Sequence, residues 1–398
     1  MKKKLLVMAA GILQVPIIKK TKELGYYVIA ADGDANAVGL QYADNAVVAN
    51  ITSEEDMLQI AKDLNVDGVI HPCSEVSMNV MGRINDELHL CGISKEMAIR
   101  ATNKHLMRKA FEEYGAPSPK SYCTTAANEA WDIFINQFET NAILKPSRNS
   151  GSRGIAKIKC GITQNEFTEL YERAYNESRD RQVLIEEFIE GPEFSVEIIV
   201  WQGKVNVLTV TDKKTTGAPF FVELGHNQPS LFPTDIVNAV KNAAVKGVKA
   251  LGLTNCACHA EIKVQNDKAF IMEIGARLGG DFISTELTHL STGIDMVAAA
   301  INVALGIEPD LRPQEEKHGV CIRYFCPKPG KLIQISNTEV LDQKCVYEWE
   351  IYRKIGDIIP TVTSSLCRSG HVIVIEKEPQ MAINLADNII NDVIIETV

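Results

Sequence analysis

Short apolar runs alternate with amphipathic segments along the first hundred residues of the chain. The runs Lys4–Ala9 and Tyr26–Ala31 are predicted to be strands, and Ile12–Leu24 between them has the spacing of a helix. This alternation of strands and helices predicts a Rossmann-like α/β domain, in which helices cover the faces of a parallel sheet. Further elements of the same pattern are expected at Asn45–Val48, Glu54–Leu64 and Gly68–His71.

The pattern changes after Pro117-Ser118-Pro119, a turn signal that follows a predicted helix at Lys104–Tyr114. Beyond it, most apolar runs have the length of strands and are joined by short turns. This texture predicts a largely antiparallel α+β region. Its expected strands are Ala142–Lys145, Ile155–Lys159, Val183–Glu187, Phe194–Val200, Val205–Thr211, Cys256–Val264 and Lys268–Ile274.

A strongly apolar helix at Ile294–Leu305 ends at Gly306 and marks a second boundary. The tail beyond it is strand-rich, with runs at Val320–Phe325 and Val372–Ile375, and closes with a helix near Gln380–Ile390. A chain of 398 residues is long enough for two or three domains. We therefore expect an α/β domain over residues 1–103, an α+β domain over 104–307 and a small C-terminal α+β domain over 308–398.

Charge and cysteine usage narrow the class of protein. The net charge of −10 argues against nucleic acid as the main partner. No apolar run approaches the ~18 residues of a membrane span, and the lysine-rich start lacks a signal-peptide cleavage site. The ten cysteines are scattered without paired CxxC spacing, and Cys256-Ala257-Cys258-His259 is better explained by core thiols than by a zinc site. A cytoplasmic protein with reduced thiols fits these observations.

An acidic residue after the second predicted strand raises the alternative of a nicotinamide dinucleotide site. Asp32 stands where such a site places its ribose-binding carboxylate. However, the first strand is followed by Ala9-Ala10-Gly11-Ile12-Leu13, which has one glycine where the phosphate fingerprint has three. The sequence therefore disfavours a nicotinamide cofactor.

The stretch from Leu144 to Ile155 carries the first sign of nucleotide chemistry. Lys145 ends one predicted strand, a loop of small residues follows, and a second strand begins. Glycine and serine let backbone N–H groups approach phosphate oxygens, and the lysine supplies a positive charge. The loop is not a Walker A loop, because it lacks Gly-Lys-Ser/Thr and leads into a strand. It has the pattern of a flap over a nucleotide, although an ordinary hairpin loop explains the same residues.

Downstream, Val183–Phe194 is an apolar strand, an acidic turn and another strand. Acidic side chains and backbone groups in this stretch can accept hydrogen bonds from an adenine amino group and from ribose hydroxyls. Taken alone, the stretch is more typical of a solvated turn.

Two glutamates on successive predicted strands suggest a metal site. If Asn266-Asp267-Lys268 forms the turn, Glu261 and Glu273 face each other directly across an antiparallel pair. Like charges in that position are destabilising unless a divalent cation lies between them. Mg²⁺ suits this arrangement, because it is bound through one or two carboxylates plus substrate phosphates.

The residues after Glu273 extend this picture. Period-two alternation places Gly275 and Arg277 on the same face as Glu273, so Arg277 points toward phosphates held by the metal. A solvated face with a surface ion pair is the alternative explanation of the same residues.

In their order along the chain, these motifs resemble the ATP-grasp superfamily, specifically its carboxylate–amine ligases. The resemblance covers nearly the whole chain, and it implies the ATP-grasp fold, with a Rossmann-like domain before it and a small C-terminal domain after it. Each motif is weak alone, and their order and spacing carry the resemblance. The matching segments are Asn103-Lys104, Lys145 with its flap, Glu186–Glu193, and Glu261 with Glu273.

The resemblance implies roles for particular residues. Lys104 and Lys145 would bind ATP phosphates, and Glu193 would hold the ribose. Glu261 and Glu273 would be the Mg²⁺ ligands, and Mn²⁺ can take the place of Mg²⁺. The mobile flap would contain Ser147, Gly151, Ser152 and Gly154, and the adenine pocket would contain Glu186, Phe188 and Ile189. The sequence departs from the pattern at Gly275, where many members have an asparagine metal ligand.

The run Glu273–Asp281 looks like the L-amino-acid ligase branch of the superfamily, which makes dipeptides. The loop Gly217–Pro229 is similar to that branch's substrate-recognition loop, in which Glu223 and His226 would approach an amino acid. The alternative explanation of the same residues is a Gly/Pro-rich surface loop. Arg277 would stabilise the oxyanion of the tetrahedral intermediate.

The resemblance therefore implies an enzyme that activates a carboxylate as an acyl phosphate with MgATP and joins it to an amine. The small-molecule substrates would be amino acids, and a homodimer is compatible with these observations. Two alternatives stay open. One is a bicarbonate-using enzyme similar to biotin carboxylase or carbamoyl-phosphate synthetase, and the other is an ATP-binding regulatory protein without turnover.

Overall fold

The computed structural model describes residues 2–149, 153–218, 220–313 and 317–398. Its N-terminal sheet is parallel, with the strand order β3-β2-β1-β4. The sequence predicted this sheet, and the fold class is confirmed. The strands are β1 (Lys4–Met8), β2 (Tyr27–Asp32), β3 (Asn45–Val48) and β4 (Gly68–Ile70).

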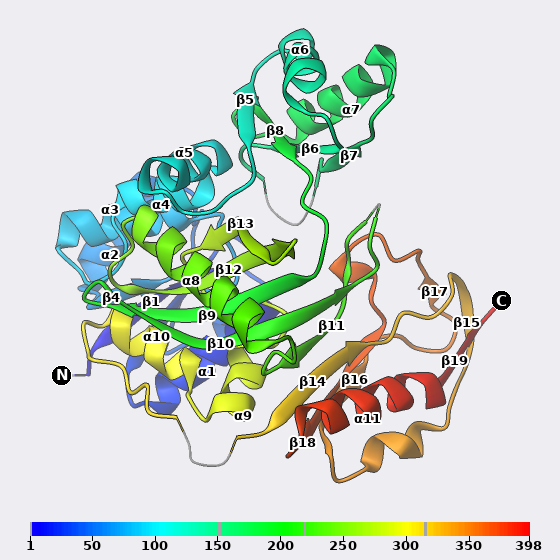
Figure 1. The fold of residues 1–398 in the computed structure, drawn as a ribbon. Coiled ribbons are helices and arrows are strands. Elements are labelled where there is room, and N and C mark those ends of the chain that lie inside the picture. Colours follow the sequence, from blue (N-terminus) through cyan, green and yellow to red (C-terminus); the bar gives the residue numbers. More distant parts are fainter. Residues whose placement is uncertain (1, 150–152, 219, 314–316) are drawn as a thin grey trace.

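Helices pack around this sheet and form with it a unit that we call the N-terminal lobe (Figure 1). Side-chain caps fix where three of the helices begin: Ser53, Ser94 and Asn103 each accept a hydrogen bond from a backbone N–H in the first turn. The helices are α1 (Val15–Glu23), α2 (Glu54–Leu64), α3 (Met78–Leu88), α4 (Lys95–Thr102) and α5 (Lys104–Tyr114).

A small lobe stands apart from the rest of the chain, at the top of Figure 1. Its antiparallel sheet has the strand order β5-β8-β6-β7, and α6 and α7 cover one face. Trp131, Phe134 and Phe167 pack together between the helices. The elements are β5 (Ser121–Thr124), α6 (Ala127–Gln137), β6 (Ala142–Pro146), β7 (Ala156–Ile158), α7 (Gln164–Glu177) and β8 (Val183–Glu187).

The large sheet is antiparallel throughout, in the order β13-β12-β9-β10-β11-β14-β18-β16. Helices α8 (Thr234–Ala250) and α10 (Met296–Ala304) pack against it, and the short helix α9 (Thr288–Thr292) lies near β10. The strands before residue 308 are β9 (Glu193–Trp201), β10 (Lys204–Thr215), β11 (Glu223–Gln228), β12 (Cys256–Gln265) and β13 (Lys268–Gly275).

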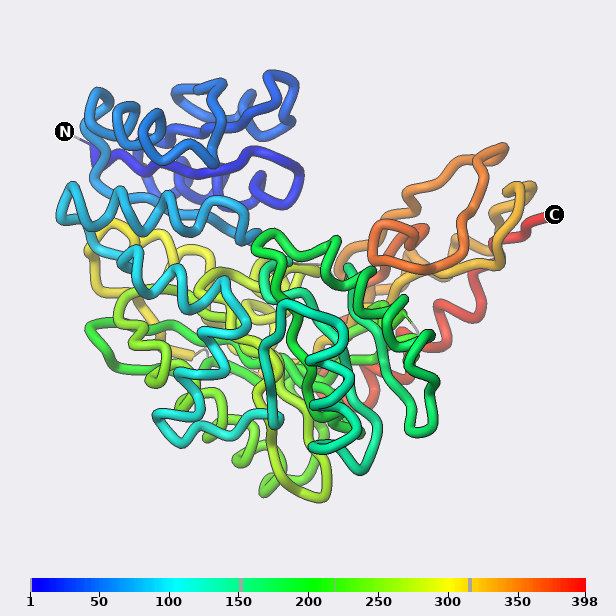
Figure 2. The backbone as a smooth tube through the Cα atoms, turned by 90° about the horizontal axis from the view of Figure 1, so that it is seen from above, coloured from blue at the N-terminus to red at the C-terminus, as the bar shows by residue number. Residues whose placement is uncertain are grey.

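The C-terminal residues continue the same sheet. Strand β14 (Gly319–Tyr324) pairs with β11, and β18 (Gly370–Glu376) and β16 (Val346–Ile351) follow it. The helix predicted near Gln380–Ile390 is α11 (Pro379–Asp392), and it covers β14 and β18. A further sheet consists of β17 (Ile358–Ile359), β15 (Gly330–Ser336) and β19 (Ile394–Thr397). Viewed from above, the C-terminal strands and the N-terminal lobe lie at opposite ends of the molecule (Figure 2). The expected boundary at residue 308 stays a prediction.

One expected loop is wrong in part. The sequence predicts a recognition loop over residues 217–229, but residues 223–228 form β11 inside the large sheet. The apolar pattern did not predict this strand, because polar residues occupy its buried positions. Gln228, for example, donates to Thr211 Oγ1 at 2.7 Å and accepts from Ser291 Oγ at 2.9 Å, so its amide is satisfied without water. Across the part of the chain that the structure describes, no helix has both the length and the apolar character needed to cross a bilayer.

Candidate active site

A cavity of about 630 Å³ lies where the small lobe, the large sheet and the N-terminal lobe meet. Its walls include parts of β6, β8, β10, β12 and β13, the loop after β4, and the C-terminal residues Thr363 and Ser364. The charged side chains on its wall include Glu75, Lys104, Lys145, Glu187, Glu193, Lys213, Glu223, Glu261, Lys263, Glu273 and Arg277. The structure thus brings most of the sequence-predicted residues into one cavity.

Glu261 and Glu273 are directly paired across β12 and β13, as the sequence predicted. The turn between the strands is shorter than expected, however. It consists of Asn266 and Asp267, both with positive φ, and Lys268 already pairs with Gln265. A two-residue turn alone would shift the register by one residue. A β-bulge after Glu261 restores the pairing, so the two carboxylates still face each other.

Two lysines neutralise this carboxylate pair. Lys104 Nζ lies 2.9 Å from Glu273 Oε1, and Lys213 Nζ lies 3.4 Å from Glu261 Oε1. The positive charge of Lys213 outweighs the opposing effect of burial and holds the pKa of Glu261 well below its ordinary value. Glu261 is therefore anionic at neutral pH.

The donor set fits Mg²⁺ that is completed by phosphate oxygens. Mg²⁺ takes oxygen ligands and is commonly bound by one or two carboxylates plus substrate phosphates. Gly275 offers no side-chain ligand and pairs with His259 through the backbone. Within the described ranges there is no cluster of three or more His, Cys, Asp or Glu side chains arranged for a metal.

Lys213 is a cavity residue that sequence reasoning missed. It lies on β10, its side chain is only 4% exposed, and its Nζ contacts Glu193 at 2.5 Å and Glu223 at 3.7 Å in addition to Glu261. Burial alone would lower the pKa of Lys213, but the three carboxylates raise it well above its ordinary value. The sequence offers little indication that Lys213 is a site residue, because it stands beside Lys214 in a strand with no motif around it.

Lys145 lines the cavity at the end of β6, with its Nζ 3.0 Å from Glu186 Oε2. Glu186 itself is 1% exposed and is not on the cavity wall. Arg108 on α5 donates to its Oε1 at 2.8 Å and to its Oε2 at 3.2 Å. Burial opposes ionisation of Glu186, yet Arg108 and Lys145 lower its pKa to about 2. The resemblance implied that Glu186 lines the adenine pocket. In the structure its carboxylate lies off the cavity wall and pairs with Lys145.

Phe188 and Ile189 form an apolar part of the wall, as expected for an adenine pocket. Lys157 Nζ lies 3.8 Å from the centre of the Phe188 ring. Phe221, from the segment before β11, faces the same ring at a centroid distance of 6.4 Å. Glu193 lies on the wall at the start of β9. Glu187 also lines the cavity and was not predicted.

The expected flap joins β6 to β7, an antiparallel pair, so the loop does lead from strand to strand. Gly154 lines the cavity in a left-handed conformation (φ +74°), where an added Cβ would lie 2.8 Å from Glu177 Cβ. Ser147 is fully buried off the wall, and its hydroxyl donates to Asn103 Oδ1. Gly151 and Ser152 lie outside the described residues. Lys104 Nζ reaches the near end of the flap and donates to the Asn149 carbonyl at 3.0 Å.

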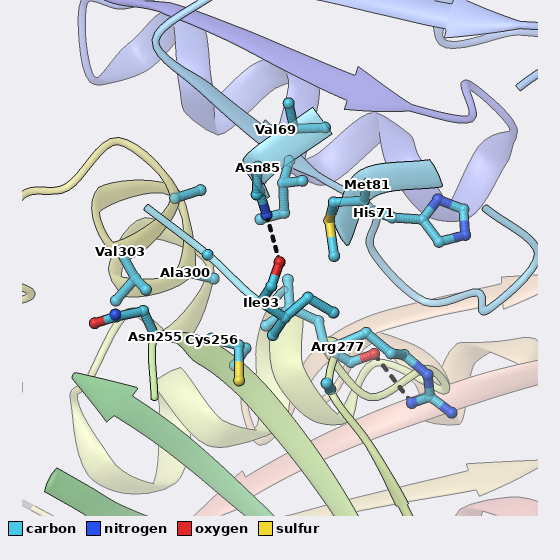
Figure 3. A pocket seen from close by; sticks show the side chains of 16 residues that line it. Val69, His71, Met81, Asn85, Ile93, Asn255, Cys256, Arg277, Ala300 and Val303 are labelled. Carbon is cyan, nitrogen blue, oxygen red and sulfur yellow. Dashed lines mark hydrogen bonds between the residues drawn. The ribbon is translucent and has the colours of Figure 1, made fainter. Parts of the chain in front are cut away.

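Arg277 lies between this cavity and a second, much smaller one of about 40 Å³ at the boundary with the N-terminal lobe. Figure 3 shows its side chain beside the small cavity, donating from Nη1 to the Leu278 carbonyl (3.1 Å), with His71 nearby. Arg277 Nε has no hydrogen-bond partner among the described residues. Its Nη2 lies 3.6 Å from Glu75 Oε1, across the boundary between the lobes.

Glu223 lines the cavity, whereas His226 does not. His226 is 1% exposed, and its Nε2 lies 3.4 Å from Asp281 Oδ2. The substrate role expected for His226 stays a prediction, and in the structure its ring is buried away from the cavity wall. His226 pairs with Lys213 across β10 and β11, and the register of this pairing shifts between His226 and Glu223.

Asp281 ties the C-terminal residues to this region. Arg368 donates two hydrogen bonds to its carboxylate, both at 2.7 Å, and stacks 3.6 Å from the centre of the Tyr324 ring. Three residues before Arg368, Ser365 Oγ donates to Glu223 Oε2 at 3.0 Å. The segment that ends at Arg368 thereby brings Thr363 and Ser364 to the cavity.

Comparison with known proteins agrees with this geometry. Residues 138–286 match the ATP-grasp domain family, and residues 323–398 match L-amino acid ligase C-terminal domain 2. The chain contains an ATP-grasp domain, and its C-terminal region is similar to a C-terminal domain of L-amino acid ligases.

Individual relatives are distant in sequence. Alanine–anticapsin ligase of Bacillus subtilis is 28% identical over 278 residues, which is 65% of this chain and 58% of that protein. The chain thus spans little more than half the length of that relative. An L-amino acid ligase structure from Bacillus licheniformis has a TM-score of 0.83 at 20% identity. The match covers 100% of this chain and 99% of that protein. Phosphoribosylglycinamide synthetase from Anaerococcus prevotii has a TM-score of 0.79 at 26% identity, with both chains fully covered.

Proposed function

We propose that this protein is an ATP-dependent carboxylate–amine ligase that joins two amino acids into a dipeptide. The observation that carries the proposal is the grouping of Glu261, Glu273, Lys104, Lys145 and Arg277 around one cavity. A paired carboxylate site for Mg²⁺, two phosphate-binding lysines and a buried arginine are the groups that a phosphoryl transfer followed by an acyl transfer needs.

The polarity of the walls supports one orientation of ATP. The adenine would lie against Phe188 and Ile189, where the cavity is apolar, and the ribose would lie near Glu193. The phosphates would then extend toward Lys145 and Lys104. Bound Mg²⁺ would be held by Glu261 and Glu273 and would neutralise developing charge on the phosphates.

The reaction has two steps. The carboxylate of the first amino acid attacks the γ-phosphate, and ADP leaves with the electrons of the broken P–O bond. The second amino acid then attacks the acyl carbon through its neutral amine. The new C–N bond forms, and phosphate departs with one former carboxylate oxygen and with the proton that the nitrogen loses. Arg277 stabilises the oxyanion of the tetrahedral intermediate, since its Nε and Nη2 groups are close to the cavity and not committed to strong partners.

The choice of amino acids as substrates rests on two observations. Residues 323–398 match a domain of L-amino acid ligases, and alanine–anticapsin ligase is named for joining an amino acid to a second compound. Glu223 on the cavity wall, hydrogen bonded by Ser365 of the C-terminal part, offers a carboxylate near the position expected for a substrate. We also propose a cytoplasmic location, because the substrates and ATP are found there.

The test is a screen of amino-acid pairs for phosphate release with MgATP. The proposal expects release that requires an amino acid, together with a dipeptide detected by mass spectrometry. Release with bicarbonate alone would favour the bicarbonate-using alternative. ATP binding without turnover for any carboxylate would favour a regulatory protein.

A further inference from the structure

Glu75 is a carboxylate on the cavity wall that the proposed reaction has not used. It lies in the loop between β4 and α3, so it comes from the N-terminal lobe and not from the ATP-grasp match. Its side chain is 13% exposed, and its closest ionic partner is Arg277, at 3.6 Å. That separation is too long for a strong hydrogen bond.

The loop that carries Glu75 is fixed on both sides. His71 Nδ1 lies 2.7 Å from the Met8 carbonyl and 3.1 Å from Ser77 Oγ, and both contacts are buried. Cys73, in a left-handed conformation (φ +58°), directs its thiol toward the Gly279 carbonyl across the lobe boundary (3.5 Å). The loop therefore holds Glu75 in a defined position beside Arg277.

Four other wall carboxylates have lysine partners. Glu273 contacts Lys104, and Lys213 is contacted by Glu193, Glu223 and Glu261. Within the described ranges, the carboxylate of Glu75 is largely buried and has one ionic contact, the long one to Arg277, so it retains unused hydrogen-bonding capacity. A buried carboxylate with free oxygens attracts a cation, and the substrate of the second step carries one: the ammonium of an amino acid.

We propose that Glu75 binds the ammonium group of the second amino acid, accepts one of its protons and holds the resulting neutral amine toward the acyl carbon that Arg277 stabilises. The inference rests on the proposed ligase function. The binding site of the second amino acid, the acceptor, would then be formed by two parts of the molecule. The N-terminal lobe supplies the carboxylate for the amine, and the large sheet supplies the arginine for the oxyanion. The acceptor is thereby required to carry a basic, charged amine.

The experiment compares two nucleophiles on the same acyl phosphate. Hydroxylamine is uncharged at neutral pH and small, so it traps the acyl phosphate as a hydroxamate without needing an ammonium site. In Glu75→Gln, we expect hydroxamate formation from the first amino acid to stay within about twofold of wild type. Dipeptide formation should fall about ten- to a hundred-fold in kcat/KM for the acceptor, mainly through KM, because a charge-assisted hydrogen bond is lost.

Glu87→Gln is the matched control, since it removes the same charge from an exposed position near the end of α3 in the same lobe. Both reactions should be unchanged in that variant. If Glu75→Gln loses hydroxamate and dipeptide to the same extent, or keeps full dipeptide synthesis, the acceptor site is not at Glu75. If the wild-type protein forms no hydroxamate with any amino acid, the ligase function itself fails, which is a different result.

Discussion

At the scale of single residues, some charged side chains of the cavity could be predicted, because their spacing along the strands brings together groups that bind a metal ion or a phosphate. The pairing of Glu261 with Glu273 followed from strand alternation, although a bulge and a shorter turn were needed to produce it. Lys213 and Glu75 could not be found this way, because they stand alone in sequence and reach the site only through the packing of distant elements. A local sequence pattern cannot identify an ion-pair partner 48 residues away, which is the separation of Glu261 from Lys213.

Lys145→Ala tests the phosphate-binding role of this lysine. The variant should bind ATP about ten- to a hundred-fold more weakly, because a charge-assisted contact with phosphate is lost. Glu186 keeps its two hydrogen bonds from Arg108, so the fold should be retained. Isothermal titration calorimetry measures the affinity, and Lys159→Ala, at an exposed position just after β7, is the control. Equal affinities for wild type and Lys145→Ala would show that the lysine only pairs with Glu186.

Glu273→Gln tests the metal site. The variant keeps the shape of the side chain but removes an anionic oxygen ligand, so turnover should be lost at ordinary Mg²⁺ concentrations. The Mg²⁺ dependence of ADP affinity, measured by calorimetry with and without the metal, should also weaken. A variant with normal turnover and an unchanged metal dependence would place the metal elsewhere.

Glu186→Gln tests the buried charge cluster behind Lys145. Removing one member of a buried ion pair costs about 3–5 kcal/mol, because Arg108 is left without its counter-charge. The folded-state pKa of about 2 is below the ordinary value of 4.5, so the stabilisation is complete above pH 4.5 and is lost as pH falls through about 2. Urea unfolding at several pH values should therefore show a large difference from wild type at pH 7 that narrows below pH 4.5. A constant difference across that range would contradict the assigned pKa.

At the scale of elements, strand and helix positions followed the apolar pattern closely where one face is buried in an ordinary way. The first strands and the final helix are at their expected positions. Strand β11 was mistaken for a loop because polar residues occupy its buried positions and satisfy one another. The helix α8 was not predicted, although its buried face (Val240, Ala244 and Val248) has helical spacing. Because alanines and lysines are spread around the helix, the buried and exposed faces of α8 differ little in hydrophobicity.

Arg368→Ala tests the connection between the C-terminal segment and the cavity. The substitution leaves the buried Asp281 carboxylate without its two-pronged partner and frees the segment that places Thr363 and Ser364 on the wall. We expect KM for an amino-acid substrate to rise while ATP affinity stays near the wild-type value. Arg312→Ala, whose arginine is 88% exposed, is the control. A loss of ATP affinity equal to the loss for amino acid would mean that Arg368 supports the whole site and not its substrate end.

At the scale of the whole molecule, the cavity exists because three parts of the chain converge on it. The small lobe supplies Lys145 and Phe188, the large sheet supplies the glutamate pair, and the N-terminal lobe supplies Glu75. The order of these parts could be predicted from the sequence through its resemblance to a known superfamily. Their contacts could not, since the Arg277–Glu75 and Asp281–Arg368 pairs join residues about two hundred and about ninety positions apart. Such pairs depend on how the lobes pack, which apolar periodicity does not encode.

The central claim is that a carboxylate is activated as an acyl phosphate before the amine attacks. The measurement that tests it most directly is oxygen transfer from a labelled amino acid. The first amino acid is supplied with ¹⁸O in its carboxylate, and the released phosphate is analysed by mass spectrometry or ³¹P NMR. Our account predicts one labelled oxygen in each phosphate for each dipeptide formed, because the attacking carboxylate oxygen stays on phosphorus when the C–N bond forms. Dipeptide formed with unlabelled phosphate, or with the label in AMP, would contradict it.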